Sequence, residues 1–171
     1  SVVAERIKRS EGLFFKFLYS MHKIITLIFT GKKINFGNYT CLTKENVNLI
    51  SSKGSLWSSY SGTIKKYIND FDTVDSIRGN RYVGPSKMSL YTLVIHSFSI
   101  IAVFKSQVLI RSILLILVLM FLKTNLGIIS VFFQSVVFLF CIMIYLVSLR
   151  EKKDELISSQ ENLKNIQNII H

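Results

Sequence analysis

The segment RGNRYVGPSK concentrates groups that can bind phosphate directly before a long apolar tract. Arg78 and Arg81 carry planar guanidinium groups, each suited to two phosphate oxygens, and Lys87 adds a mobile point charge. Gly84 permits close approach of the backbone, and Ser86 can cap the helix expected to follow. The segment therefore predicts a phosphate site at a membrane surface. The alternative is a polybasic anchor, which needs only charge.

A second basic cluster lies near the start of the chain, where SVVAERIKR predicts a strand that ends in charged residues. Arg6 and Arg9 leave the carboxyl end of this strand, a position from which side chains can line a crevice. Taken alone, the cluster is better explained by a solvated charged run.

The composition favours a membrane partner over nucleic acid. The chain has 171 residues, 50% of them hydrophobic, and a formal net charge of +11. No acidic residue occurs between Asp75 and Glu151, and most of that interval is apolar. A nucleic-acid-binding protein is often basic but does not need such an apolar tract. Binding to an anionic lipid or a lipid phosphate accounts for both the positive charge and the apolar tract. Cys41 and Cys141 lack metal-ligand spacing and are interpreted as small hydrophobes in a reducing compartment.

The apolar tract predicts an interface helix followed by a transmembrane hairpin. The first block, Leu90 to Phe104 within an expected interface helix 89–105, has only 15 residues. It is too short for the hydrocarbon core, which needs about 20 residues. A polar stripe follows one face of it, made of Ser89, Thr92, His96 and Ser99. We expect this block to lie in the membrane interface. The region 106–149 is expected to form two spanning helices joined by KTNLG, with Arg111 reaching the headgroups.

The flanking charges predict the orientation of the hairpin. Lys105 and Arg111 precede it, and Arg150, Lys152 and Lys153 follow it, whereas the turn carries only Lys123. Positive charge accumulates on the cytoplasmic side of membrane proteins. The sequence therefore predicts a multi-pass protein of the cytoplasmic (inner) membrane with both hairpin ends in the cytoplasm.

Residues 1–88 are expected to form a cytosolic domain of mixed α and β structure. We expect a first strand, a helix ending at Gly31, a short strand after a turn at Gly37, a helix capped by Thr43, one helix over SLWSSYSGTIKKYI and a strand over FDTVDSI. The first helix carries a wide apolar stripe that could face a sheet or a membrane surface, made of Leu13, Phe17, Tyr19, Ile24, Leu27 and Ile28.

The carboxyl-terminal region, 150–171, is expected to be a charged cytosolic helix. Its heptad-like spacing leaves two interpretations open, a helix packed on its own domain or a coiled-coil partner site. The predicted fold class is thus a mainly α membrane protein with a partial α/β remnant, an interface helix, a transmembrane hairpin and a terminal helix.

The order of these motifs resembles a known family. The chain resembles the carboxyl-terminal half of a family 2 glycosyltransferase in three motifs that occur in the same order. These are an R-x-x-R pair after a strand, then G-N-Y-T-C-L, then R-G-x-R-Y-x-G-x-S-K-M, which leads into an amphipathic helix and a hairpin. The closest type is membrane-anchored and polyprenyl-phosphate dependent, like dolichol-phosphate mannose synthase. The resemblance covers residues 2–150, is most specific over 78–88, and implies a GT-A-like domain in 1–88.

The resemblance also implies roles for individual residues. Arg6 and Arg9 correspond to the arginine pair that faces the donor diphosphate or the acceptor phosphate. The turn beside the active site corresponds to Gly37, Asn38 and Tyr39. Some relatives carry Asp where this chain has Asn38, which cannot accept a proton. A lipid phosphate is already anionic, however, and can act as its own nucleophile once positioned.

The remaining motif corresponds to a loop that closes over the donor and guides the lipid phosphate. Its matching residues are Arg81, Gly84, Ser86 and Lys87, and we expect Arg81, Lys87 and Asn38 to act in catalysis. Arg6, Arg9, Arg78, Gly84, Ser86 and Tyr39 are expected to bind phosphate or substrate.

The implied activity moves a sugar from a nucleotide sugar to a polyprenyl-phosphate lipid in the synthesis of a cell-envelope glycan. Family members hold Mg²⁺ or Mn²⁺ with an Asp-x-Asp motif in an amino-terminal half. Asp70 and Asp72 resemble that motif only superficially, because they follow the active-site turn. We therefore expect the chain to be a fragment that is inactive alone, with no metal ligands of its own. Nucleic acid is not an expected partner, and a homo-oligomer is left open. The alternative function is a non-catalytic membrane tether that binds anionic lipid and a protein partner.

Overall fold

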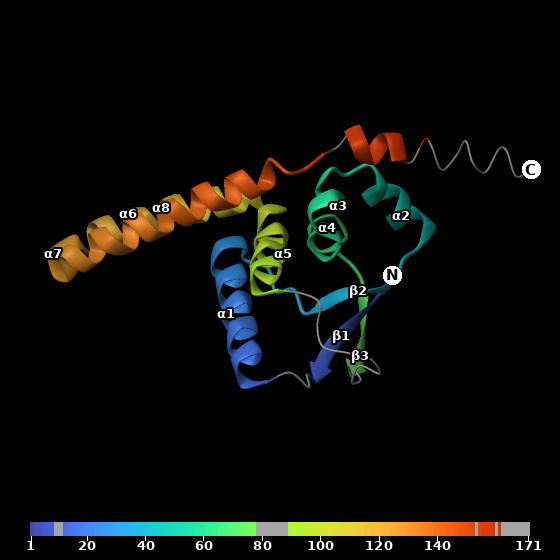
Figure 1. Cartoon of the computed structure of the whole chain (residues 1–171), viewed down its shortest axis with the longest axis horizontal. Coiled ribbons are helices and arrows are strands. Elements are labelled where there is room, and N and C mark those ends of the chain that lie inside the picture. Colours follow the sequence, from blue (N-terminus) through green and yellow to red (C-terminus); the bar gives the residue numbers. More distant parts are fainter. Residues whose placement is uncertain (9–11, 78–88, 153, 160, 162–171) are drawn as a thin grey trace, which may run out of the picture.

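The computed structural model describes residues 1–8, 12–77, 89–152, 154–159 and 161, and it is mostly helical with a small sheet. The elements in chain order are β1 (Val2–Lys8), α1 (Leu13–Thr30), β2 (Phe36–Cys41), α2 (Lys44–Ser51), α3 (Ser55–Ser58), α4 (Tyr60–Tyr67), β3 (Asp72–Ile77), α5 (Leu90–Ala102), α6 (Lys105–Phe121), α7 (Lys123–Leu126) and α8 (Ile128–Ser148). Helices α6 and α8 form a hairpin that extends away from the other elements, with α7 at its tip (Figure 1).

The three strands form one mixed sheet in the order β2-β1-β3. Strand β1 is antiparallel to β2 and parallel to β3, and both outer strands have the positions expected from the sequence. The expected turn at Gly37 is wrong, because this glycine lies inside β2. Val3 pairs with Thr40 and Glu5 pairs with Phe36, so residues 37–39 stand opposite Ala4 alone. The extra residues form a bulge in β2.

Helices α2, α3 and α4 lie beside the sheet, and α2 and α4 pack against it to form an apolar core. This core is built from Val3, Ile50, Ile64 and Ile68. The single helix expected over SLWSSYSGTIKKYI is wrong, because it breaks at Ser59. That residue has an extended backbone (φ −158°, ψ 120°), and its hydroxyl accepts a hydrogen bond from the backbone N–H of Gly62. Ser59 therefore ends α3 and caps α4, a role for which serine is well suited. Thr43 caps α2 as expected.

A second apolar cluster joins α1, α5, α6 and α8 where the hairpin meets the rest of the chain. Ile101, Ala102, Val108 and Ile144 form its buried centre, with Ile25, Phe29, Phe98, Phe140 and Val147 packed around them. The chain bends by 89° between α5 and α6 at this cluster. Val103 and Phe104, which make the bend, are fully buried. The bend therefore directs α5 away from the hairpin and alongside α1 (Figure 1).

Two basic side chains bind carbonyl groups at helix ends beside this cluster. Arg111 donates from Nη1 to the carbonyl of Ile28 near the end of α1, at 3.3 Å. Lys66 donates from Nζ to the carbonyl of Val103 just after α5, at 2.7 Å. Cations are favourable at the carboxyl ends of helices, where unpaired carbonyls concentrate negative potential. Arg111 thus connects α1 to α6, a role different from the headgroup contact expected from the sequence.

The hairpin has a narrow seam of small and medium side chains. Ser130, Val137 and Ile144 are buried at intervals of one heptad along α8. The Ser130 hydroxyl donates to the carbonyl of Leu119 and accepts from Nε2 of Gln134 at 3.0 Å. Small residues and such hydrogen bonds allow close helix packing in an apolar environment. The expected KTNLG turn contains the short helix α7, and Gly127 follows it with φ +55°.

Two helices, α1 and α8, are long and apolar enough to cross a membrane, and α5 with α6 would make a third span if the bent pair counts as one. The sequence predicted α8 as a span but not α1. Most of the large apolar side chains of α1, α6 and α8 are exposed. Such extensive apolar exposure is typical of a surface that contacts lipid. In the tail, residues 154–159 are helical, and the later part of the expected heptad pattern lies outside the described residues.

Gly31 ends α1 in the left-handed conformation with φ +70°, and a Cβ there would lie 2.5 Å from Nη2 of Arg111. We expect Gly31→Ala to lower the free energy of unfolding by about 1–2 kcal/mol, because left-handed backbone disfavours a side chain. Thermal unfolding in detergent, followed by circular dichroism, measures the change. Gly12→Ala is the control, since φ there is −60° and nothing lies within 4 Å of the added Cβ. Equal stabilities of the two variants would contradict the expectation.

Candidate functional site

Most of the phosphate-binding residues expected from the sequence lie outside the described residues. These are Arg9, Arg78, Arg81, Gly84, Ser86 and Lys87. Arg6 is described only by its backbone position in β1. The roles expected for these side chains stay predictions, and the structure bears on them through the strands that lead to them.

The parallel pairing of β1 and β3 places the ends of these two strands side by side, and the strands lead to residues 9–11 and 78–88. Val2 pairs with Asp72 at the start of the pair, and Lys8 pairs with Ile77 at its end. Arg6 stands beside Ser76. Because the strands are parallel neighbours, the chain enters 9–11 and 78–88 from adjacent points. Nothing in the spacing of the two clusters along the sequence required this proximity.

Asn38 and Tyr39 lie on β2, on the other side of β1. Tyr39 is 74% exposed, and the two residues belong to the bulge opposite Ala4. Nearby, Nδ2 of Asn35 donates to Oε1 of Glu5 at 2.9 Å, which links the start of β2 to β1. The bulge therefore presents these side chains from a strand neighbouring that of Arg6, and not from the expected turn.

The helix after the basic loop begins at a different residue from the one expected. Ser89 is the N-cap of α5, and its hydroxyl accepts from the backbone N–H of Thr92 at 3.2 Å. A further hydrogen bond of 2.9 Å joins the hydroxyls of the two residues. The expectation that Ser86 caps this helix is therefore wrong. Ser86 lies outside the described residues, and its expected contact with phosphate stays a prediction.

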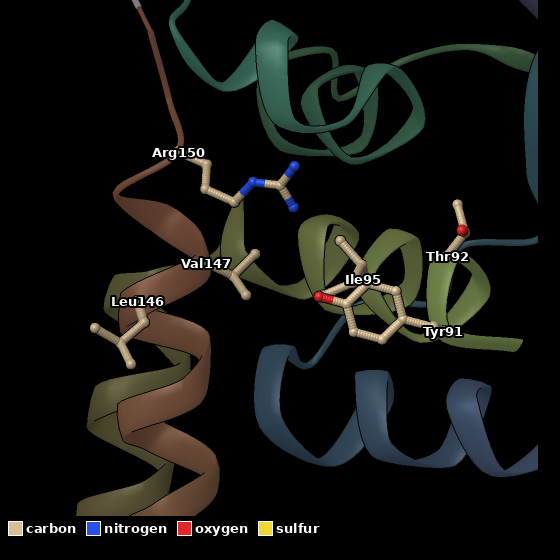
Figure 2. Close-up of a pocket in the computed structure, with 6 residues that line it drawn as sticks. All are labelled: Tyr91, Thr92, Ile95, Leu146, Val147 and Arg150. Atoms are coloured by element: carbon tan, nitrogen blue, oxygen red, sulfur yellow. The ribbon is translucent and has the colours of Figure 1, made fainter.

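A groove runs along α5 between the end of α8 and α3. Its larger part, of about 480 Å³, is lined by Tyr91, Thr92, Ile95, Leu146, Val147 and Arg150 (Figure 2). Its smaller part, of about 240 Å³, is lined by Trp57, Ser58, Thr92, Ile95, His96, Ser99 and Arg150. We call the whole the Arg150 groove, because Thr92, Ile95 and Arg150 line both parts.

The predicted polar stripe lines this groove with three of its residues, Thr92, His96 and Ser99. This agrees with the helical spacing from which the stripe was predicted. Trp57 and Arg150 were missed as site residues. Arg150 was noted only as a charge that sets topology, and no pattern in the sequence indicates that it meets α5.

The groove combines one permanent cation with neutral polar groups. Partial burial lowers the pKa of His96 below its ordinary value of 6.5, because desolvation disfavours the charged imidazolium. His96 is therefore neutral at pH 7, when one ring nitrogen can donate a hydrogen bond and the other can accept. Arg150 supplies the guanidinium group in both parts of the groove.

Metal ligands are not gathered in the part of the chain that the structure describes. No group of three or more His, Cys, Asp or Glu side chains is arranged there to hold an ion. These residues do not fit the Mg²⁺ or Mn²⁺ that the family resemblance implies.

Comparison with protein families, characterised proteins and solved structures gives no significant match for this chain. The resemblance to family 2 glycosyltransferases therefore rests on the motifs in the sequence.

The lowered pKa of His96 predicts how stability depends on pH. The unfolded chain takes up a proton near pH 6.5, whereas the folded protein takes it up only at lower pH. Protonation therefore favours unfolding, and the contribution of His96 to stability is lost as the pH falls from about 6.5 through the lowered pKa. We expect nuclear magnetic resonance to give a titration midpoint below 6.5 for the imidazole that His96→Gln removes. A midpoint at or above 6.5 would contradict this assignment.

Proposed function

We propose that the chain belongs to a membrane-anchored glycosyltransferase that moves a sugar from a nucleotide sugar to a polyprenyl phosphate at the cytoplasmic face of the inner membrane. The observation that carries the proposal is the parallel pairing of β1 with β3. The strands that lead to the two arginine-containing segments end side by side. This supports the proposal that cations of both segments act on the same pair of anionic substrates. The motif order in the sequence gives this arrangement its specific interpretation.

The proposed membrane position follows from the bend between α5 and α6. If the α6–α8 hairpin crosses the bilayer, the 89° bend leaves α5 near the plane of the interface. Helix α1 runs beside α5 (Figure 1). Its side chains Phe17, Ile24 and Ile28 are exposed. Although α1 is long enough to span, this position favours an interfacial helix with its apolar face in lipid. The hairpin ends, the sheet and the basic segments then lie in the cytoplasm.

In the proposed reaction, an oxygen of the lipid phosphate attacks the anomeric carbon of the sugar. The bond from that carbon to the nucleotide diphosphate breaks, and the nucleoside diphosphate leaves with the bonding electrons. The nucleophile is already anionic, so Asn38 need not accept a proton and is left to position substrate. Arg6, Arg9, Arg81 and Lys87 are proposed to offset charge on the phosphates and bring the two anions together. A Mg²⁺ or Mn²⁺ ion held by other residues of the complete enzyme would stabilise the leaving diphosphate.

A second candidate is a non-catalytic membrane tether. The observation that favours it is the broad apolar exposure of α1, α6 and α8 beside an excess of basic residues. Such a protein needs only charge and apolar area to bind an anionic membrane. It does not need guanidinium geometry, and that difference separates the two candidates.

Arg81→Lys in the complete protein tests the enzyme against the tether. Lysine keeps the charge but loses the fork that holds two phosphate oxygens, so we expect sugar transfer to fall by about tenfold or more. Membrane association should be unchanged. The measurement is transfer of radiolabelled sugar to a polyprenyl phosphate from a panel of nucleotide sugars, with membrane flotation in parallel. Arg81→Ala, which removes the charge, is the comparison. Unaltered transfer in Arg81→Lys would contradict the assigned role.

The two cysteines test the membrane position independently of catalysis. Cys41 is exposed on β2 and Cys141 lies within α8. With single-cysteine variants Cys141→Ser and Cys41→Ser, we expect a membrane-impermeant maleimide to label Cys41 in inverted vesicles but not in intact cells. Cys141 should be protected in both, because lipid excludes the reagent. Labelling of Cys41 in intact cells would show that the sheet faces the outside of the cell, opposite to the proposed orientation. Labelling of Cys141 in vesicles would show that α8 lies outside the hydrocarbon core.

A further inference from the structure

We propose that the Arg150 groove binds the head of a membrane lipid that carries a single phosphate. This site is separate from the sheet edge at which transfer is proposed, and its residues are all among those that the structure describes. The inference goes beyond the proposed function, because lipid binding here would hold for a transferase and for a tether alike.

The first argument is that the charge of Arg150 is available. The adjacent acid, Glu151, is paired with Lys105, whose Nζ lies 3.7 Å from its Oε2. Lys152 is paired with Glu155. Within the described part of the chain, no acidic group pairs with the Arg150 guanidinium, and no acid lines the groove. In Figure 2 the guanidinium points into the space over α5. A cation without an internal partner in an acid-free groove favours an anionic ligand.

The second argument is the mixture of polar and apolar walls. Hydroxyl groups of Tyr91, Thr92 and Ser99 and the neutral imidazole of His96 line the groove beside the cation. The Tyr91 hydroxyl and the His96 imidazole can donate hydrogen bonds to phosphate oxygens, whereas the Ser99 hydroxyl already donates to the carbonyl of Ile95 and the Thr92 hydroxyl is hydrogen-bonded to that of Ser89. A guanidinium can hold two oxygens of one phosphate. Apolar side chains also line it, with Ile95 on α5 and Leu146 and Val147 at the end of α8 (Figure 2). An amphiphile with an anionic head satisfies both kinds of wall.

The third argument is that the groove opens onto the surface proposed to contact lipid. It lies at the end of α8, where Tyr145 and Leu146 are more than half exposed. A lipid head in the groove could therefore extend its hydrocarbon chain along the outside of α8 without leaving the membrane. Free phosphate would gain nothing from this apolar continuation, which favours a lipid over a soluble anion.

Trp57 provides a direct measurement, because it lines the groove and is the only tryptophan in the chain. The full chain would be placed in phosphatidylcholine nanodiscs and titrated with phosphatidic acid, undecaprenyl phosphate or inorganic phosphate, without any sugar donor. We expect a saturable change in Trp57 fluorescence with at least one lipid phosphate, at concentrations at least about tenfold below those needed for inorganic phosphate. Saturation by phosphatidic acid identifies a general phospholipid site, and saturation by undecaprenyl phosphate alone identifies a site for that lipid. Inorganic phosphate binding as tightly as the lipids would overturn the proposal.

Matched variants separate a site from general surface charge. Arg150→Gln and Lys152→Gln remove the same charge two residues apart, but only Arg150 lines the groove. We expect Arg150→Gln to weaken lipid binding by about tenfold or more, as expected for loss of a charge-assisted hydrogen bond, and Lys152→Gln by no more than about twofold. Thr92→Phe should also abolish binding, because it fills both parts of the groove without changing charge.

Equal effects of the two charge variants, or full binding by Thr92→Phe, would overturn the proposal. Circular dichroism confirms that each variant is folded before its binding is interpreted. Because no sugar transfer is measured, failure of lipid binding here would leave the glycosyltransferase proposal standing. Conversely, loss of transfer in the Arg81 variants would leave this site intact.

Discussion

The arrangement of this chain depends on satisfying the backbone carbonyls that α1 and α5 leave unpaired at their carboxyl ends. Both ends lie beside the second apolar cluster. The end of α5 is partly buried, where an unpaired carbonyl is costly, whereas the end of α1 is exposed. Arg111 of α6 reaches the end of α1, and Lys66 of α4 reaches the end of α5. Each cation also compensates the negative end of a helix. These two contacts join α1 to α6 of the hairpin and α5 to α4 beside the sheet.

The bend between α5 and α6 makes the proposed membrane arrangement possible. A continuous helix through this region would carry α5 along the hairpin and away from α3 and α4. Instead, Phe104 is fully buried at the corner, and α4 approaches α5 closely at Gly62. A Cβ at Gly62 would lie 3.1 Å from Cγ2 of Val103 and 3.2 Å from the carbonyl oxygen of Ile100. A side chain there would require its neighbours to shift by a few tenths of an ångström, so glycine favours the close approach of α4 to α5. Helix α3, which precedes α4, supplies Trp57 and Ser58 to the Arg150 groove.

Local features of the chain were predictable to the extent that neighbouring residues decide them. The end of α1 at Gly31 and the cap of α2 at Thr43 follow from residue preferences at helix ends, and both are confirmed. The break at Ser59 was missed because serine is tolerated within a helix as well as at its start. The cap of α5 was assigned three residues too early, because both Ser86 and Ser89 are competent caps and only the helix start distinguishes them. The bulge in β2 depends on the partner strand, which single-strand patterns do not contain.

The sequence by itself determined that the chain has long apolar helices, a basic interval without acidic residues and a small α/β segment, because composition and periodicity are properties of consecutive residues. It also placed Thr92, His96 and Ser99 on one face, since that spacing depends only on the helix. Tertiary structure alone decided that β1 and β3 are parallel neighbours, that Arg111 binds the end of α1, and that Arg150 meets α5 across the groove. These relations join residues far apart in the chain. Their free energy comes from packing and from carbonyl and charge compensation in three dimensions, which no local pattern records.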